Sequence, residues 1–337
     1  MSEVQRRVTA ELDRIDSVLG PLGGRFVAAG ESLALVGGPV RDAMLGRLHH
    51  DLDFATSARP EVTEQLLAGW ADAIWDIGRA FGTIGARKGE WIVEITTYRS
   101  EKYDASSRKP DVAYGTSLTG DLGRRDFTIN AMAVSVPGRE FEDPHGGVVD
   151  LAHRRIRTPG RPEDSFSDDP LRMMRAARFA AQLGFTVEPE VVAAMTAMAE
   201  RIEIISAERV RDELVKLVCA PHPRLGLTLL VETGLAQRVL PELPALALER
   251  DEHHRHKDVY HHTLAVLEQA IALEPRLPRG LTGGGPDFVS RFAALMHDVG
   301  KPPTRKFLDD GTVTFHHHDV VGAKLTRKRM QALRFSG

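Results

Sequence analysis

Short apolar runs separated by turn residues characterise the first part of the chain. The runs of strand length, each bounded by Gly, Asp or Ser, are residues 33–38, 51–56, 80–87, 90–99 and 129–136. Lys88 and Gly89 lie between two of them and predict a hairpin. This alternation of strands with turns and short helices predicts an α/β head, built as a mixed sheet with helices, over residues 1–155.

From about residue 160 the apolar residues recur at spacings of three and four, which is typical of amphipathic helices. The segments with this pattern are residues 168–185, 188–202, 206–220 and 224–235. Gly184, Pro221 and Gly234 interrupt the pattern and separate the helices. We therefore expect an all-α neck and body over residues 156–250.

The remaining segment, residues 251–337, is predicted to be a further helical domain that is rich in histidine. Nine of the 14 histidines lie between His253 and His318. His253, His254 and His256 belong to a charged run, and we expect them to be solvated. The pattern is still helical at the end of the sequence, so we expect a piece of a longer protein and an incomplete last domain.

The composition is that of an ordinary globular protein. The 337 residues are 42% hydrophobic and 27% charged, with a net charge of -3, so the chain as a whole is not strongly basic. A single cysteine, Cys219, excludes an internal disulfide and suits a reducing cytoplasm. The N-terminus reads as a polar helix and not as a signal peptide, and no apolar run approaches membrane-spanning length. These features predict a cytoplasmic protein without a membrane partner.

Two aspartates, Asp51 and Asp53, lie on one predicted strand with Leu52 between them. Residues i and i+2 of a strand point to the same face, so the two carboxylates project together. Carboxylates this close repel each other unless a cation lies between them, and Mg²⁺ prefers such oxygen ligands. A solvated turn with two ordinary acids is the alternative that a bare Asp-x-Asp pattern leaves open.

The residues before this pair favour a phosphate site. Gly37 and Gly38 close the preceding strand and let the backbone approach a ligand, and Pro39 suits the first turn of a helix. The N–H groups at such a helix start can face a phosphate. Arg41 can pair with a phosphate, or with a neighbouring acid such as Asp42.

Glu94 is the third candidate carboxylate, because it interrupts an otherwise apolar strand. A nucleotidyl-transfer site commonly has such an acid beside the attacking hydroxyl. An edge-strand acid that faces water is the alternative interpretation.

Residues 35–56 resemble motif A of the class II tRNA nucleotidyltransferase and poly(A) polymerase family, which includes the CCA-adding enzymes. Other segments resemble later motifs of the family in the expected order. They are the strand pair at 82–99, the loop and "RRDFTxNA" segment at 109–133, the "EDxxR" segment at 168–185 and the neck segment at 205–218. Ordered matches are far more specific than one motif alone. The resemblance implies a polymerase-beta-like nucleotidyltransferase fold for the head.

The resemblance also implies roles for the residues of the head. Asp51 and Asp53 would hold two Mg²⁺ ions with Glu94 as the third carboxylate. Gly37, Gly38 and Arg41 would cradle the triphosphate of the nucleotide.

In the "RRDFTIN" segment, Arg124, Asp126 and Asn130 would contact ribose and phosphates. A surface charge cluster is the alternative, although the apolar residues that follow would bury this segment against the sheet.

Asp169 and Arg172 match the acid and the arginine of the family's base-reading motif. On a predicted helix they are three residues apart and share a face. The acid would accept from the exocyclic amine of cytosine or adenine, and the arginine would donate to the ring or carbonyl. A local ion pair of small energetic worth is the alternative. Pro170 suits the first helical position.

Two further arginines join this nucleotide-binding set by resemblance. Arg175 lies three residues after Arg172. Arg209 would complete the base pocket. The sequence departs from the family at Asp168, where many members carry Glu.

His297 and Asp298, followed by Gly-Lys-Pro, resemble the metal-binding motif of HD phosphohydrolases. In that resemblance the ligands are His262, His297, Asp298 and His318, and imidazole with carboxylate suits a transition metal more than Mg²⁺. The HD family adds an Asp from a later helix, for which this sequence offers no match. A structural HD-like fold without catalysis is the alternative.

The function that the resemblance implies is template-independent addition of CCA to the 3' end of tRNA from CTP and ATP. A poly(A) polymerase, or an enzyme that adds only A or CC, would use the same chemistry. An HD phosphohydrolase with a vestigial head and a noncatalytic RNA-binding protein are alternatives of other classes. The set of Asp51, Asp53 and Glu94 disfavours both.

Overall fold

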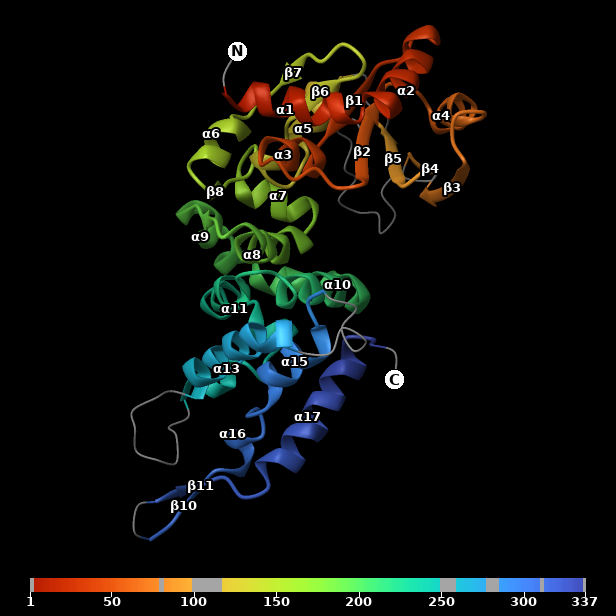
Figure 1. Ribbon diagram of the computed structural model, residues 1–337. Helices are drawn as coiled ribbons and strands as arrows, with labels where there is room; N and C mark the ends of the chain where they lie inside the picture. The colour runs from red at the N-terminus through yellow and green to blue at the C-terminus, as the bar shows by residue number, and fades with distance from the viewer. Residues whose placement is uncertain are drawn as a thin grey trace. The chain divides into compact units, whose positions relative to one another are not determined.

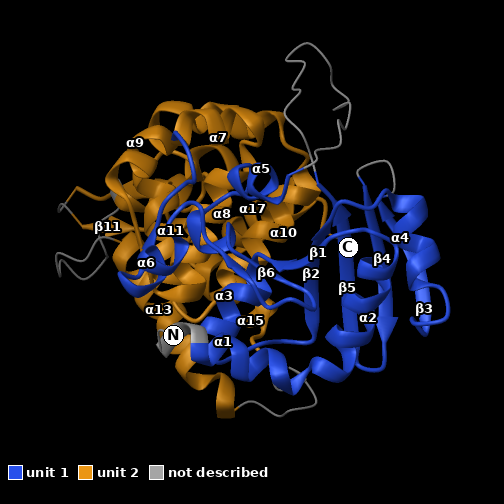
Figure 2. Ribbon diagram, turned by 90° about the horizontal axis from the view of Figure 1, so that it is seen from above, with its two compact units in different colours: residues 1–161 blue, residues 162–337 orange. Residues whose placement is uncertain are grey.

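The computed structural model describes residues 3–78, 82–98, 117–248, 259–276, 285–309 and 312–335. The chain divides into two compact units, residues 1–161 and 162–337, which Figure 2 distinguishes by colour. His253, His254, His256 and part of the loop before Ser117 lie outside the described residues.

The first unit contains a mixed sheet, as the sequence predicts, and this sheet has seven strands (Figure 1). Its strands are β1 (Leu33–Val36), β2 (Asp51–Thr56), β3 (Ala73–Gly78), β4 (Thr83–Lys88), β5 (Trp91–Thr97), β6 (Ala133–Ser135) and β7 (Phe141–Glu142). They follow the order β3-β4-β5-β2-β1-β6-β7. The β2–β5 pair is parallel, and the other neighbours pair antiparallel. The carboxylate-bearing strands β2 and β5 therefore lie side by side.

Helices cover one face of this sheet. The unit's helices are α1 (Glu3–Arg14), α2 (Asp16–Ala28), α3 (Gly38–Met44), α4 (Pro60–Leu67), α5 (Leu118–Gly123) and α6 (Gly147–Ala152), and the short strand β8 is Arg155–Ile156. The helix α2 packs on β1, and α4 packs on β4 and β5. Leu52 and Phe54 alternate with Asp51 and Asp53 along β2 and are buried on this face.

Among the described residues of the unit, α5 covers one end of the opposite face. There α5 contacts β2, and Leu122 of α5 packs in a buried cluster with Ala34, Ala55 and Ala133. These small side chains let the helix approach the sheet closely. Along the starts of β2 and β5 the same face carries exposed Asp51, Asp53 and Glu94.

The predicted strand at 129–136 is wrong at its beginning. Residues Thr128–Asn130 form a 3₁₀ turn, and only Ala133–Ser135 pair in the sheet. Side-chain hydrogen bonds of Thr128 and Asn130, described below, hold this turn and compete with a strand ladder. The strands β3 and β7 lie at the two edges of the sheet and were not predicted, although β3 contains Ile74, Trp75 and Ile77.

The second unit is mainly helical. Its helices are α7 (Pro162–Asp168), α8 (Leu171–Leu183), α9 (Pro189–Met198), α10 (Ala207–Val218), α11 (Pro223–Glu232), α12 (Ala236–Val239), α13 (Val259–Leu273), α15 (Phe288–Met296), α16 (Lys301–Thr304) and α17 (His318–Ala332). The short strand β9 is Thr186–Val187, and β10 (Lys306–Phe307) pairs with β11 (Val313–Thr314). The helix α8 packs against α10 and α11, and α13 packs against α15. Within the described residues, no helix is long and apolar enough to cross a membrane.

The start of α8 differs from the prediction. The helix begins at Leu171, so Asp169 lies in the turn between α7 and α8, and Pro170 occupies the N-cap position. Asp169 and Arg172 therefore do not share one helix.

Candidate active site

The register of β2 and β5 brings the three predicted carboxylates to one face. Asp51 lies opposite Ile92 and Asp53 opposite Glu94. Partial burial raises the pKa of Glu94, and the charges of Asp53 and then Asp51 raise it further. The three acids thus repel one another at an exposed position. A divalent cation would relieve this repulsion, and an all-oxygen donor set fits Mg²⁺.

A glycine turn leads from β1 into α3. Gly37 has φ +73°, a conformation that favours glycine, and its N–H donates to the Met132 carbonyl at 3.2 Å. A Cβ at this position would lie 2.8 Å from Nη1 of Arg125. The turn is therefore packed against the guanidinium of the "RRD" segment, and Pro39 lies in the first turn of α3 as predicted.

Buried hydrogen bonds connect α3 to this segment. Arg41, which is 4% exposed, donates to both carboxylate oxygens of Asp42 at 3.0 Å and to Oδ1 of Asn130 at 2.7 Å. Asn130 in turn donates to Oδ1 of Asp126 at 3.0 Å. The local pairing of Arg41 with an acid is therefore present, and three of the sequence-predicted residues form one network.

The two arginines of the segment follow α5. Arg124 is the C-cap residue of this helix, and Arg125 donates to Asp121 at 3.3 Å. The helix α5 packs on the carboxylate-bearing face of the sheet, so the backbone of both arginines lies on that side of the sheet.

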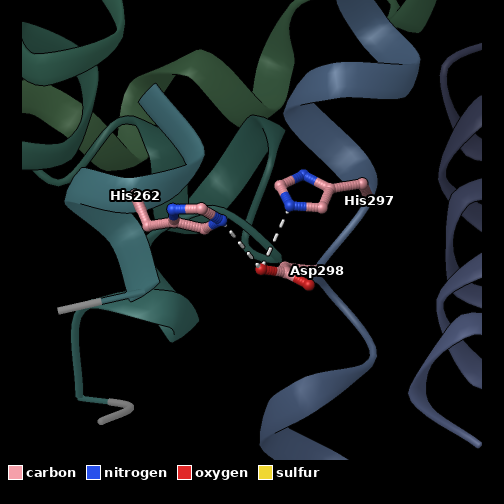
Figure 3. Close-up of side chains that lie close together, drawn as sticks. All are labelled: His262, His297 and Asp298. Carbon is pink, nitrogen blue, oxygen red and sulfur yellow. Dashed lines mark ion pairs between the residues drawn. The ribbon is translucent and has the colours of Figure 1, made fainter. Parts of the chain in front are cut away.

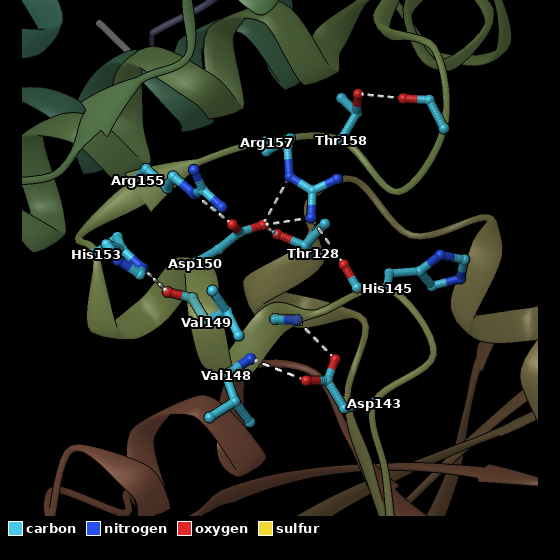
Figure 4. A network of polar contacts seen from close by, with 12 residues as sticks. Thr128, Asp143, His145, Val148, Val149, Asp150, His153, Arg155, Arg157 and Thr158 are labelled. Carbon is cyan, nitrogen blue, oxygen red and sulfur yellow. Dashed lines mark hydrogen bonds and ion pairs between the residues drawn. The ribbon is translucent and has the colours of Figure 1, made fainter.

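Asp150, which was not predicted as a site residue, accepts a hydrogen bond from Thr128 of the 3₁₀ turn (Figure 4). Its carboxylate is fully buried and accepts from Thr128 Oγ1 and Arg155 Nε at 2.5 Å, and from Arg157 Nε at 3.0 Å. A Cβ on Gly147 would lie 2.3 Å from the Thr128 carbonyl, so α6 touches the turn directly. The available sequence signal was an acid between apolar residues in "GGVVDLA".

The predicted base-reading residues are close together in the second unit. Arg209, near the start of α10, donates to Oδ2 of Asp169 at 2.8 Å, and Oδ1 of Asp169 accepts from the Leu171 N–H at 3.1 Å. Arg172 donates to Oγ of Ser165 at 2.9 Å. Arg175 lies further along α8 with its guanidinium 5.8 Å from the Phe179 ring.

The predicted HD residues converge on Asp298 (Figure 3). Nε2 of His297, His262 and His318 lies 3.1, 3.9 and 3.8 Å from the Asp298 carboxylate, respectively. The possible ligand atoms of His262, His297 and Asp298 all lie within 4.8 Å of one another. Imidazole with carboxylate is a donor set that a transition metal can use.

Gly300 explains how α17 reaches this cluster. A Cβ at Gly300 would lie 1.9 Å from the His318 carbonyl oxygen, so only glycine allows the contact. Lys301, which was not predicted, lies with Nζ 3.0 Å from Oδ2 of Asp298. Burial opposes ionisation of Asp298, but hydrogen bonds and charges from His297 and then Lys301 outweigh it and lower the pKa to about 2. The hydrogen bond with Asp298 raises the pKa of His297.

The sheet, its carboxylate row and the glycine turn define the head as a nucleotidyltransferase-type domain. Family models match three segments: "Poly A polymerase head domain" over residues 33–157, "Probable RNA and SrmB- binding site of polymerase A" over 184–246, and "HD domain" over 259–336. The chain belongs to the class II tRNA nucleotidyltransferase and poly(A) polymerase family, with a C-terminal HD domain.

Relatives of similar sequence are named CCA-adding enzymes. The chain is 46% identical to the one from Levilactobacillus brevis over 210 residues, which cover 62% of this chain and 52% of that protein. It is 40% identical to the one from Bacillus velezensis over 228 residues, covering 67% and 55%. The chain therefore spans about half the length of the curated relatives it matches.

A solved structure of similar fold is the Bacillus stearothermophilus CCA-adding enzyme in complex with CTP. It is 27% identical, with a TM-score of 0.58, over 92% of this chain and 81% of that one. A tRNA nucleotidyltransferase solved with a primer tRNA and an incoming ATP analogue has a TM-score of 0.63 at 24% identity, and shares the fold.

Proposed function

We propose that this protein adds CCA to the 3' end of tRNA, using CTP and ATP without a nucleic-acid template. The observation that carries the proposal is the row of Asp51, Asp53 and Glu94 on one exposed sheet face beside a glycine turn. The relatives named CCA-adding enzymes support the choice of substrate.

In the proposed mechanism Asp51 and Asp53 hold Mg²⁺, with Glu94 as the third carboxylate on the side of the attacking hydroxyl. Mg²⁺ held by these carboxylates would supply a lowered pKa of the RNA 3'-hydroxyl and positive charge beside the triphosphate. The protein contributes position and charge.

The remaining head residues orient the nucleotide. Gly37 and Gly38 leave room for the triphosphate, and Arg124 meets its anionic oxygens. Asp126 and Asn130 contact the ribose, and the network with Arg41 fixes their positions.

Base choice is assigned to Asp169, Arg172, Arg175 and Arg209. A carboxylate accepts from the amine that cytosine and adenine share, and guanidinium groups donate to ring nitrogen or carbonyl. Arg209 holds the Asp169 carboxylate, so its removal would free that acid to turn.

The test is incubation of the protein with tRNA that lacks its terminal CCA, Mg²⁺ and each labelled nucleotide in turn. Incorporation of two C and then one A supports the proposal. Incorporation of A alone, or of C alone, would replace it with poly(A) or A addition, or with CC addition. No incorporation of any nucleotide would reject nucleotidyl transfer for this chain.

The HD cluster favours a second activity, hydrolysis of a phosphate ester. The approach of His262, His297 and His318 to Asp298 is the specific observation. The test is hydrolysis of a chromogenic phosphate ester with added Ni²⁺ or Mn²⁺; no hydrolysis with either metal would favour a structural role.

A further inference from the structure

An aromatic and basic surface adjoins the carboxylate row on its β3 side. Gly85 of β4 lies opposite Glu94 of β5, and Trp75 of β3 lies opposite Gly85. A Cβ on Gly85 would be 2.5 Å from Nε1 of Trp75 and 2.6 Å from Cδ1 of Ile77. Both side chains therefore lie over Gly85, one strand away from Glu94, about 5 Å in a sheet.

This surface is exposed and carries a cation. Trp75 and Ile77 are 37% and 45% exposed. Arg87, two residues after Gly85, is exposed and points to the same face, because side chains alternate along a strand. Its strand partner Ile92 is 39% exposed and lies opposite Asp51. Going across this face from β2 towards β3, the carboxylates of Asp51, Asp53 and Glu94 come first, followed by the indole of Trp75 and the guanidinium of Arg87.

The sheet order gives this surface a direction. The glycine turn after β1 and the "RRD" segment before β6 lie on one side of the carboxylate strands, and β4 and β3 lie on the other. In phosphoryl transfer the attacking and leaving oxygens are roughly in line. With the triphosphate on the β1 side, the attacking hydroxyl approaches from the β4 and β3 side, where Trp75 and Arg87 lie.

We propose that Trp75, Ile77 and Arg87 bind the last nucleotides of the RNA that is extended. Trp75 stacks on a base, Ile77 extends the apolar surface beneath it, and Arg87 meets a backbone phosphate. Aromatic side chains beside basic ones are how proteins bind single-stranded ends without reading the sequence. This inference rests on the proposed nucleotidyl transfer and adds a site for its second substrate.

The test measures both binding and turnover with fluorescently labelled tRNA lacking CCA. Trp75→Ala and Trp75→Leu are expected to raise the Kd and KM for tRNA about tenfold, since stacking contributes this much per base, while the KM for CTP is unchanged. Trp75→Phe keeps an aromatic face and should stay near wild type. Val27→Ala, at a 60% exposed apolar residue of α2, is the control.

The Trp75→Leu variant distinguishes a role of Trp75 in binding RNA from a role in shielding Gly85 from solvent. Leucine still shields Gly85, so a wild-type tRNA affinity for Trp75→Leu would reduce the indole to a cover of the sheet and overturn the proposal. A rise in the KM for CTP without a change for tRNA would also overturn it. If wild type binds the tRNA but does not extend it, the proposed function fails, while the binding data still decide on the surface.

Arg87 has its own test, the salt dependence of the tRNA Kd. Arg87→Gln should lower the slope of log Kd against log salt by ~0.7, one phosphate of a single strand. Lys88→Gln is the matched control, because Lys88 points to the other face and lies 3.4 Å from Asp72. Equal slopes for Arg87→Gln and wild type would exclude Arg87 from the proposed RNA-binding site.

Discussion

At the scale of single residues, the head places three carboxylates, those of Asp51, Asp53 and Glu94, on one face of the sheet. Arg41, the buried cation of the turn, is directed to Asp42 and Asn130. The charges of Asp51 and Asp53 instead act on Glu94 and raise its pKa. This arrangement is suited to holding a metal ion and is poor as a source of stability.

Asp51→Ala and Asp53→Ala are expected to abolish nucleotide incorporation while the fold persists, because each removes an exposed carboxylate that is proposed to hold Mg²⁺. Incorporation into tRNA and thermal unfolding are measured together. Asp76→Ala is the control, an exposed acid on β3 whose strand partner Ile84 belongs to the buried face. Near wild-type incorporation in either variant would contradict the metal assignment.

Arg172→Ala should change nucleotide choice more than Mg²⁺ dependence, since base reading is proposed for Arg172, whose guanidinium donates to Ser165 of α7. Incorporation of CTP, ATP, GTP and UTP is measured separately, and discrimination is expected to fall by about tenfold or more. Arg201→Ala, which removes a bond to the Ser167 carbonyl, is the control. Unchanged ratios of the four nucleotides would exclude the base-reading role.

The residues that sequence reasoning found were those with a local signature. Asp51 and Asp53 lie on one face because strand period is two, and Gly37 needs its positive φ. The pairings of Asn130 with Arg41 and of Asp169 with Arg209 are tertiary, and no spacing in the sequence specifies them.

At the scale of elements, the 3₁₀ turn of Thr128–Asn130 depends on α6. The Thr128 hydroxyl donates to Asp150, and its N–H donates to the Arg157 carbonyl at 2.8 Å. This 3₁₀ turn also positions Asn130, whose side-chain oxygen accepts from Arg41. If Asn130 contacts the nucleotide as proposed, this short segment couples the stability of the fold to nucleotide binding.

Thr128→Val should destabilise the protein by ~1–2 kcal/mol, because it removes a donor from a fully buried carboxylate. The KM for CTP should rise with it. Denaturant unfolding and steady-state kinetics measure the two effects. The control, Thr196→Val, removes an exposed hydroxyl that bonds only within α9, and is expected to stay within ~0.5 kcal/mol. Equal stability of both variants would show that Asp150 does not hold the turn.

The helix α15 is tied to the end of α10 through one buried arginine. Arg291 donates to the carbonyls of Val218 and Ala220 at 3.0 and 2.8 Å, and pairs with both oxygens of Glu274 at 2.6 and 2.7 Å. These hydrogen bonds with Arg291 are the main cause that lowers the pKa of Glu274 from its ordinary 4.5.

Arg291→Met is expected to cost ~3 kcal/mol at pH 7, because it leaves buried acceptors without their donor. A lowered carboxyl pKa stabilises the fold above the unfolded value of 4.5, and this contribution is lost as the pH falls through the folded pKa. The difference in free energy of unfolding between Arg291→Met and wild type should therefore decrease below about pH 4.5. Unfolding curves between pH 7 and 3 measure it.

The exposed Arg224–Glu268 pair supplies the control for this experiment. Its two N···O distances are both 2.7 Å, but the side chains are 34% and 49% exposed. Arg224→Met should therefore cost at most ~1 kcal/mol. A similar loss of unfolding free energy in both variants would mean that burial does not determine how much the Arg291–Glu274 pair stabilises the fold.

The elements that the sequence located are those with strong periodicity. The strand β2 and the helices α8, α10 and α11 agree with their predictions within a few residues. The edge strand β3 was not predicted: its apolar residues Trp75 and Ile77 are exposed, so its pattern does not alternate between a buried and a solvated face. The 3₁₀ turn was missed because tertiary hydrogen bonds of Thr128 and Asn130 determine it.

At the scale of the whole molecule, the carboxylate row and the HD cluster belong to different units. His297→Ala should leave tRNA extension within about twofold of wild type and abolish any metal-dependent phosphate-ester hydrolysis, because sites in separate compact units that share no partner residues are expected to act nearly additively. Both assays are run on one preparation with thermal unfolding as the check. Loss of extension in a folded His297→Ala protein would show that the two units act as one.

The position of β1 in the sheet has a consequence during synthesis of the protein. β1 pairs with β2 on one side and with β6 on the other, but Ala133–Ser135 leave the ribosome long after Leu33–Val36. Until then one edge of an apolar strand has no partner, and such edges pair readily with other chains. A ribosome stalled before Ala133–Ser135 are made should therefore expose a nascent chain that needs a chaperone, whereas one stalled far enough past β7 for these residues to have emerged should not.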